Sequence, residues 1–219
     1  MSYDEWDAAQ ENYIDELLED FYATRGPDIA EEAIETFRSD RFRSYFVDNP
    51  MIIEPARRHL AQARQLLAKN ESDAALVFAA SAVEIGIKEG LYRPVVHGLL
   101  VDSNGAALII ATHLLNQTEL DRFKELLFEV LATEVRLDLK TYVHPGGTKK
   151  LWDEISETQK RRNEILHRGT TKTVADAEMA LRAATAVVET LFPSMVNSLR
   201  LHIHEGCRIC DLSACKGQP

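Results

Sequence analysis

Cysteine is scarce in this chain of 219 residues, and all of it lies at one end. Cys207, Cys210 and Cys215 fall within the last thirteen residues. An odd, clustered set near a terminus is not the disulfide framework of a small secreted protein, so a local metal site or free thiols are expected. The N-terminus also lacks a basic stretch followed by an apolar one, which a secretory signal requires. We therefore expect a cytoplasmic protein.

Long hydrophobic runs are missing as well. The longest, at 74–83 and 105–111, fall short of the roughly 18 apolar residues that a membrane-spanning helix needs, so no span is expected. The alternation of apolar and polar residues that strands require is almost absent. With 45% hydrophobic and 27% charged residues, the composition is that of a globular protein with one sizeable core.

Acidic residues dominate the chain unevenly. The formal net charge is −10, but residues 1–40 alone hold thirteen acids against two bases, which leaves the rest of the chain at +1. Between residues 149 and 172, seven Lys and Arg face four acids. Because affinity for phosphates comes mainly from Lys and Arg, this basic stretch is where the chain would meet a polyanion. The acidic start is interpreted as the solvated face of a helix or, alternatively, as a docking arm for a basic partner.

Apolar residues recur at helical spacing through most of the chain. The expected helices span 3–22, 28 to near 49, 55–69, 72–92, 106–115, 119–139, 149–166 and 174 to about 202. Gly26-Pro27 should separate the first two, and Pro193 should kink the last. The helix at 72–92 is apolar on nearly every side, so it should lie at the centre of a bundle. We predict an all-α protein with an acidic helical extension (1–50), a helical bundle (51–200) and a short Cys/His-rich tail (201–219).

One charged side chain stands out in the helix expected at 149–166. Arg162 falls in the middle of the apolar stripe that begins at Leu151 and ends at Leu166. A guanidinium cannot lose its proton, so this position on a core-facing or interface-facing stripe is costly unless anionic groups meet it. Asn163 and His167 share the adjoining flank. The glycine at 169 is a natural helix stop, which places His167 in a last turn whose carbonyl dipoles favour a protonated imidazole.

The segment 162–167 therefore reads Arg-Asn-x-x-x-His, and it resembles the signature of the HEPN superfamily (higher eukaryotes and prokaryotes nucleotide-binding domains). The order of elements is similar too: an alanine-rich central helix with a lone acid, an intervening segment, a helix ending in Leu-His-Arg-Gly, and a closing helix. The similarity covers roughly residues 51–200. It implies a dimeric helical bundle and, as in the active branch of the family, a metal-independent endoribonuclease with a composite site at the dimer interface.

Glu84 is the lone acid of the alanine-rich run 74–87 in the helix expected at 72–92, where it lies among apolar positions. A buried carboxylate requires a cationic partner, and Arg162 is the expected one. The alternative is a peripheral pair with Lys88, four residues further on.

RNA cleavage without a metal uses the ribose 2′-hydroxyl as the nucleophile, and it needs proton transfers and stabilised charge on the phosphorus oxygens. Arg162 suits the second task, and His167 suits the first because imidazole titrates near neutral pH. A two-fold dimer would supply two copies of each, with Asn163 orienting His167 or contacting the phosphate. The side chains expected to hold the RNA backbone without reading its sequence are Lys160, Arg161, Arg168 and Lys172.

The tail contains a Cys-x-x-Cys pair with histidines before it and a cysteine after it. Zinc prefers four nitrogen or sulfur ligands in a tetrahedron. The simplest set is His204, Cys207, Cys210 and Cys215, with His202 in reserve. Such a zinc would be structural, since the cleavage chemistry needs no metal. A plain thiol-bearing tail is the alternative.

The leading interpretation is a HEPN-type endoribonuclease that acts on RNA as a homodimer, as a growth-arresting toxin or an anti-phage effector, under an antitoxin or regulatory protein. The second is a non-catalytic HEPN-like module for dimerisation or ligand binding that acts through a partner protein. In that case Arg162 and Glu84 only fix the packing, and His167 is a solvated residue at a helix end. A third is an adaptor that interacts through a zinc-bound tail.

Overall fold

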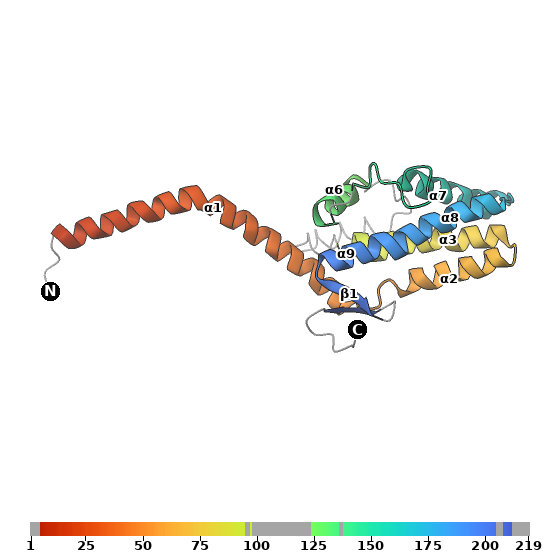
Figure 1. Ribbon diagram of the computed structural model, residues 1–219, viewed down its shortest axis with the longest axis horizontal. Coiled ribbons are helices and arrows are strands. Elements are labelled where there is room, and N and C mark those ends of the chain that lie inside the picture. The colour runs from red at the N-terminus through yellow and green to blue at the C-terminus, as the bar shows by residue number, and fades with distance from the viewer. Residues whose placement is uncertain (1–4, 95–96, 98–123, 136–137, 205–207, 212–219) are drawn as a thin grey trace. The chain divides into compact units, whose positions relative to one another are not determined.

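The structure is a computed structural model that describes residues 5–94, 97, 124–135, 138–204 and 208–211. Most of the described residues are helical, which confirms the all-α class (Figure 1). The chain divides into two units, Met1–Asp40 and Arg41–Pro219. The expected helix at 106–115 lies outside the described residues.

The first unit is formed by the larger part of α1 (Glu5–Asp48). The predicted break at Gly26-Pro27 was wrong, because α1 is continuous through both residues. Proline removes one intrahelical hydrogen bond, but the sequence on either side is rich in Ala, Leu and Glu, which are strong helix formers. Within this unit Tyr13, Ile14 and Leu17 are largely exposed, so the helix carries an apolar stripe on an acidic segment.

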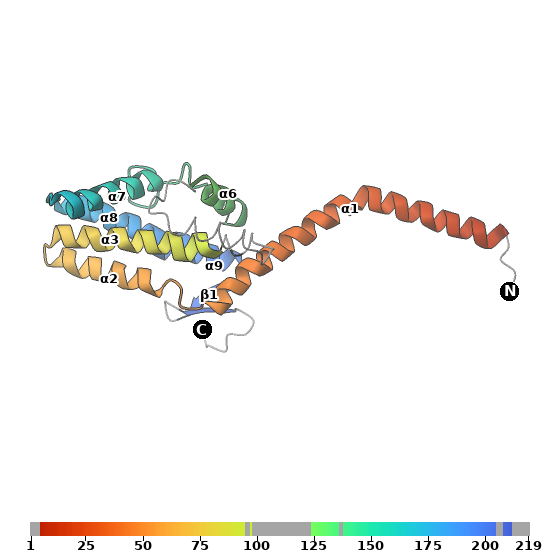
Figure 2. The ribbon, with the colours of Figure 1, turned by 180° about the vertical axis from the view of Figure 1, so that it is seen from behind.

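The second unit is the helical bundle. Its main helices are α2 (Glu54–Ala68), α3 (Ser72–Ile87), α7 (Leu151–Arg168) and α8 (Val174–Ala186). As predicted, α3 is central: it contacts α2, α7 and α8. Figure 2 shows the same four helices side by side from behind. The alanine-rich α3 and α8 allow close approach of the two backbones at the centre of the core.

Two single π-helical segments interrupt the long helices. η1 (Lys88–Tyr92) continues α3, and η3 (Val187–Leu191) joins α8 to α9 (Phe192–Ser198). A π-helical turn thus lies just before Pro193, where the sequence predicts a kink. One close contact forms here, since a Cβ atom on Gly90 would come within 2.7 Å of Cδ2 of Phe192.

α6 (Lys124–Val135) precedes α7 and packs on it through Phe128, whose ring lies edge-on to Trp152 at a centroid distance of 5.0 Å. The helix predicted at 119–139 was too long at its C-terminal end, because Asp138 begins a turn. Its carboxylate accepts hydrogen bonds from the backbone N–H of Lys140 and the hydroxyl of Thr141, each at 2.9 Å. An Asp that bonds the backbone two residues on favours a turn over a helix.

The tail differs from the prediction. The last helix ends at Ser198 instead of continuing to about 202, and an antiparallel hairpin follows, made of β1 (Leu201–His204) and β2 (Arg208–Asp211). Leu201 and Ile209 are buried against the bundle, and the N–H of Ile209 donates to the carbonyl of Pro50 at 2.8 Å. Four-residue strands are too short for the alternation to be recognised in the sequence.

The boundary between extension and bundle also lies earlier than residue 50. Phe42 and Phe46, at the C-terminal end of α1, are fully buried in the bundle core. Among the described residues, one helical stretch, Val174–Ser198, is long and apolar enough to cross a membrane by length and composition, and most of its apolar window is buried inside the protein. That burial is typical of a core helix.

Candidate functional site

The motif helix α7 is fixed firmly at both ends. Its first turns bury Leu151, Trp152 and Ile155 in the core, and the N–H of Leu151 donates to the carbonyl of Tyr142 at 2.9 Å. The helix ends at Gly169, whose φ of 62° is the left-handed conformation that glycine adopts without strain. The predicted helix stop is therefore confirmed.

The apolar stripe of α7 changes character along the helix. Ile165 is partly buried against the core, whereas Leu166 is 51% exposed. Arg162 lies between these environments: its side chain is partly buried, and Nη1 donates to Oδ1 of Asn163 at 3.0 Å. Its Nε is buried and makes no hydrogen bond with the described part of the chain. The stripe thus leaves the core and reaches the surface at the motif.

Asn163 and His167 are both exposed on the last two turns of α7. Asn163 is held by its bond with Arg162, and His167 has its imidazole open to solvent next to the helix terminus. The structure therefore gathers the three motif residues at one accessible helix end. Such a group can offer a guanidinium, an amide and an imidazole to one ligand.

Glu84 does not pair with Arg162 within the chain. Its side chain is 22% exposed, and Lys88 Nζ approaches its Oε1 at 2.7 Å. This is the alternative considered above, and it forms because residues four apart on a helix face each other. Arg162 consequently has no carboxylate partner among the residues that the structure describes.

The four predicted RNA-binding cations divide into two kinds. Lys160 and Arg168 are exposed. Arg161 forms ion pairs with Glu157 and Asp176, and Lys172 forms one with Glu164. The ion pairs of Arg161 and Lys172 therefore connect α7 with the start of α8 and with the segment before it.

The surroundings of the motif are electropositive. The pKa of the Glu164 carboxyl is lowered, first by the hydrogen bond from Lys172 and then by the charges of Lys172, Lys160 and Arg168. The segment between α7 and α8 is also anchored, because the N–H of Lys172 donates to Asp73 Oδ1 at 2.6 Å. A capping box between Thr173 and Asp176 begins α8. The cationic end of α7 therefore rests on a fixed framework.

The predicted zinc ligands are only partly covered by the structure. Cys207 and Cys215 lie outside the described residues. Cys210 pairs across the hairpin with His202, which places both on one face of the two strands, and the rings of His202 and His204 lie 6.1 Å apart. Within the described ranges, no three ligating side chains form a group that would hold a metal. Zinc binding by the tail stays a prediction.

One polar pair in the core was not predicted from the sequence. His144 and Glu154 are both buried, at 4% and 2% exposure, and Nε2 and Oε2 lie 2.6 Å apart. From the sequence, His144 is expected only to be a surface residue or a satisfied core residue, and nothing in the sequence predicts its pairing with Glu154. The available signal was His-Pro-Gly-Gly at 144–147, a turn sequence that holds a histidine just before α7.

Comparison of the chain with protein-family models, with curated proteins and with solved structures finds no significant match.

Proposed function

We propose that this protein is a metal-independent endoribonuclease of the HEPN kind, with Arg162, Asn163 and His167 as its active-site residues. The observation that supports this most is that Arg162 has no carboxylate partner among the described residues. A purely structural role for that guanidinium required a carboxylate such as Glu84, and Glu84 is bonded to Lys88 instead. A partly buried arginine at an exposed helix end, whose guanidinium bonds only a neutral amide among the described residues, can bind an anion from outside the chain.

The roles follow from the chemistry of each group. His167 transfers protons to or from the ribose 2′-hydroxyl and the leaving 5′-oxygen. Arg162 stabilises the charge that develops on the phosphorus oxygens, and Asn163 holds the guanidinium in place through their hydrogen bond. Lys160 and Arg168 contact the RNA backbone. Arg161, Lys172 and Glu84 leave the proposed site, since each already has an ion-pair partner in the chain.

A single chain supplies one histidine, whereas the reaction benefits from an acid and a base. We infer that two chains meet along the exposed end of α7 and bring two copies of His167 to one cleft. The half-exposed Leu166, next to the motif, gives that contact an apolar centre. In this proposal the protein acts in the cytoplasm as a toxin or anti-phage effector, held in check by an antitoxin or regulatory protein.

The decisive experiment is RNA cleavage by the purified full-length protein in EDTA. We expect fragments that end in a 2′,3′-cyclic phosphate, and no cleavage of the same oligonucleotide made with 2′-deoxyribose, because the nucleophile is then missing. Intact RNA would instead favour the alternative, a non-catalytic module for dimerisation or ligand binding.

His167→Ala should lower the cleavage rate by about 10²–10⁴-fold, the usual contribution of a general acid or base. The fold should be unchanged, since the side chain is exposed. His59→Gln is the matched control, because His59 lies on α2 and bonds the carbonyl of Pro55 at 2.8 Å. Equal cleavage rates for wild type and His167→Ala would exclude His167 from the chemistry.

A further inference from the structure

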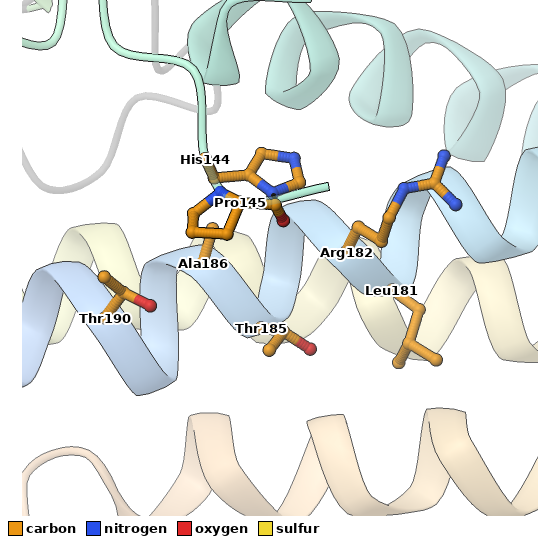
Figure 3. Close-up of a pocket in the computed structure, with 7 residues that line it drawn as sticks. All are labelled: His144, Pro145, Leu181, Arg182, Thr185, Ala186 and Thr190. Atoms are coloured by element: carbon orange, nitrogen blue, oxygen red, sulfur yellow. Dashed lines mark hydrogen bonds between the residues drawn. The ribbon is translucent and has the colours of Figure 1, made fainter. Parts of the chain in front are cut away.

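A cavity of about 270 Å³ opens on another part of the bundle, outside the motif. Figure 3 shows it below the turn that precedes α7 and along α8 and η3. The turn contributes His144 and Pro145, and the helical side contributes Leu181, Arg182, Thr185 and Thr190. The volume is slightly below the roughly 300–1,000 Å³ of pockets that hold drug-sized ligands, so a smaller molecule fits best.

The turn that forms one wall is conformationally fixed. The N–H of Gly147 donates to the carbonyl of His144 at 2.9 Å, and Gly146 has a φ of 82°. Proline at the second position and a glycine with positive φ at the third define a type II turn. Gly147 cannot be larger, because a Cβ atom there would lie 2.7 Å from His144 Nε2. The wall is therefore preformed.

The histidine in this wall is fully bonded. Its Nδ1 lies 3.0 Å from the carbonyl of Pro145 and its Nε2 lies 2.6 Å from Glu154 Oε2. A carbonyl only accepts, so Nδ1 donates to it, and Nε2 is occupied by the Glu154 carboxyl group. His144 thus has no ring nitrogen left for a ligand. Polar groups that could bind a ligand in the cavity therefore come from α8 and η3.

That side presents one uncompensated positive charge. Arg182 is exposed and forms no ion pair or hydrogen bond with any described residue. Arg64, in contrast, is neutralised by two 2.8 Å bonds to Glu189. Thr185 Oγ1 accepts a bond from Arg64 at 3.2 Å, which leaves its own hydrogen free to donate, and the Thr190 hydroxyl has no partner among the described residues.

We propose that this cavity is a binding site for a small organic anion, with a carboxylate or phosphate oxygen pair held by Arg182. The guanidinium offers two parallel donors to such a group. The Thr185 hydroxyl, three residues further along the helix than Arg182, donates to the same ligand, and Leu181 and Pro145 contact its carbon skeleton. The proposal is independent of the ribonuclease activity, since none of these residues belongs to the motif.

The test measures binding of two probes to the full-length protein, pyruvate for the carboxylate and glycerol 3-phosphate for the phosphate, by NMR of the Leu181, Thr185 and Thr190 methyl groups. We expect saturable shifts with at least one probe, and the probe that binds identifies the oxyanion. Arg182→Ala should weaken binding by about tenfold or more, the effect of losing a charge-assisted hydrogen bond. Thr185→Val, which keeps the shape, should weaken it by less.

Arg58→Ala is the matched control, because Arg58 is an exposed arginine of the same bundle that does not line the cavity. It should leave the affinity unchanged. The proposal fails if neither probe gives saturable shifts, if Arg182→Ala binds as tightly as the wild type, or if Arg58→Ala weakens binding as much as Arg182→Ala does. The last result would indicate attraction by net charge only.

Discussion

At the scale of single residues, some of the ion pairs join side chains one helical turn apart. Glu84 bonds Lys88 one turn away, and Arg161 bonds Glu157 in the same way. Both pairs have the i,i+4 spacing, which needs no tertiary placement. The consequence for α7 is selective: Arg161 is neutralised locally, while Arg162, its sequence neighbour, bonds only the uncharged Asn163.

Glu84→Gln tests this assignment directly. Because Glu84 pairs with Lys88 on one partly exposed helix face, we expect a loss of about 0.5 kcal/mol in the free energy of unfolding, measured by urea denaturation. RNA cleavage should be unaffected. A loss of about 3 kcal/mol together with loss of cleavage would mean that Glu84 meets Arg162 across a dimer.

At the scale of elements, the close approach of η1 to Phe192 of α9 depends on a glycine at position 90. Gly90→Ala should destabilise the protein by about 1–3 kcal/mol, because the new methyl group overlaps the Phe192 ring in the packed core. The measurement is the denaturation midpoint. In the double variant Gly90→Ala with Phe192→Leu, the smaller side chain relieves the overlap, so the combined loss should be less than the sum of the two single losses. Simple additivity would place the strain elsewhere.

The hairpin carries the metal prediction. Protein purified without added metal should contain about one zinc per chain by elemental analysis, and Cys207→Ser with Cys210→Ser should lose it, since thiolates are the ligands that zinc prefers. The helical signal in circular dichroism should be the same in both proteins, because the bundle core does not include the cysteines. A wild-type protein without zinc would contradict the prediction.

Helices whose apolar residues keep helical spacing over many residues were predictable from the sequence. Elements that depend on tertiary contacts were not. α2, α7 and the start of α8 lie within two residues of their predicted bounds, because Pro55, Gly169 and Thr173 mark helix ends locally. The helix α1 continues through Pro27 because strong helix formers lie on both sides of it. A proline alone predicts a break, so the sequence rule missed this continuity. Formation of β1 depends on burial of Leu201, which the sequence does not display.

The candidate site was predictable to a similar extent. Helical spacing places Asn163 and His167 on one face, and both are exposed at the end of α7. The burial of Arg162 was harder to predict from the sequence. Helical periodicity shows which face of α7 carries the apolar stripe, but it does not show at which residue that face leaves the core. That point depends on which helices cover the stripe, a property of the assembled bundle.

At the scale of the whole molecule, association of two chains is the property to measure. Leu166→Asp should convert a dimer into a monomer in light scattering after size exclusion, because a carboxylate replaces an apolar side chain at the proposed contact. Cleavage should fall with it. Met51→Asp, at a similarly exposed residue in the turn before α2, is the control and should stay dimeric. A monomeric wild-type protein that cleaves RNA would rule out the composite site.

The C-terminal end of α1 packs against segments that are synthesised much later. The ring of Phe46 packs edge-on against Phe192 at 5.9 Å, and Arg43 pairs with Asp211 near the end of the chain. At translation speeds of about 5–20 residues per second, Phe46 waits roughly 10–30 s for Phe192 to be made. Until Phe192 is made, a nascent chain therefore lacks the ring that packs on Phe46 in the folded bundle.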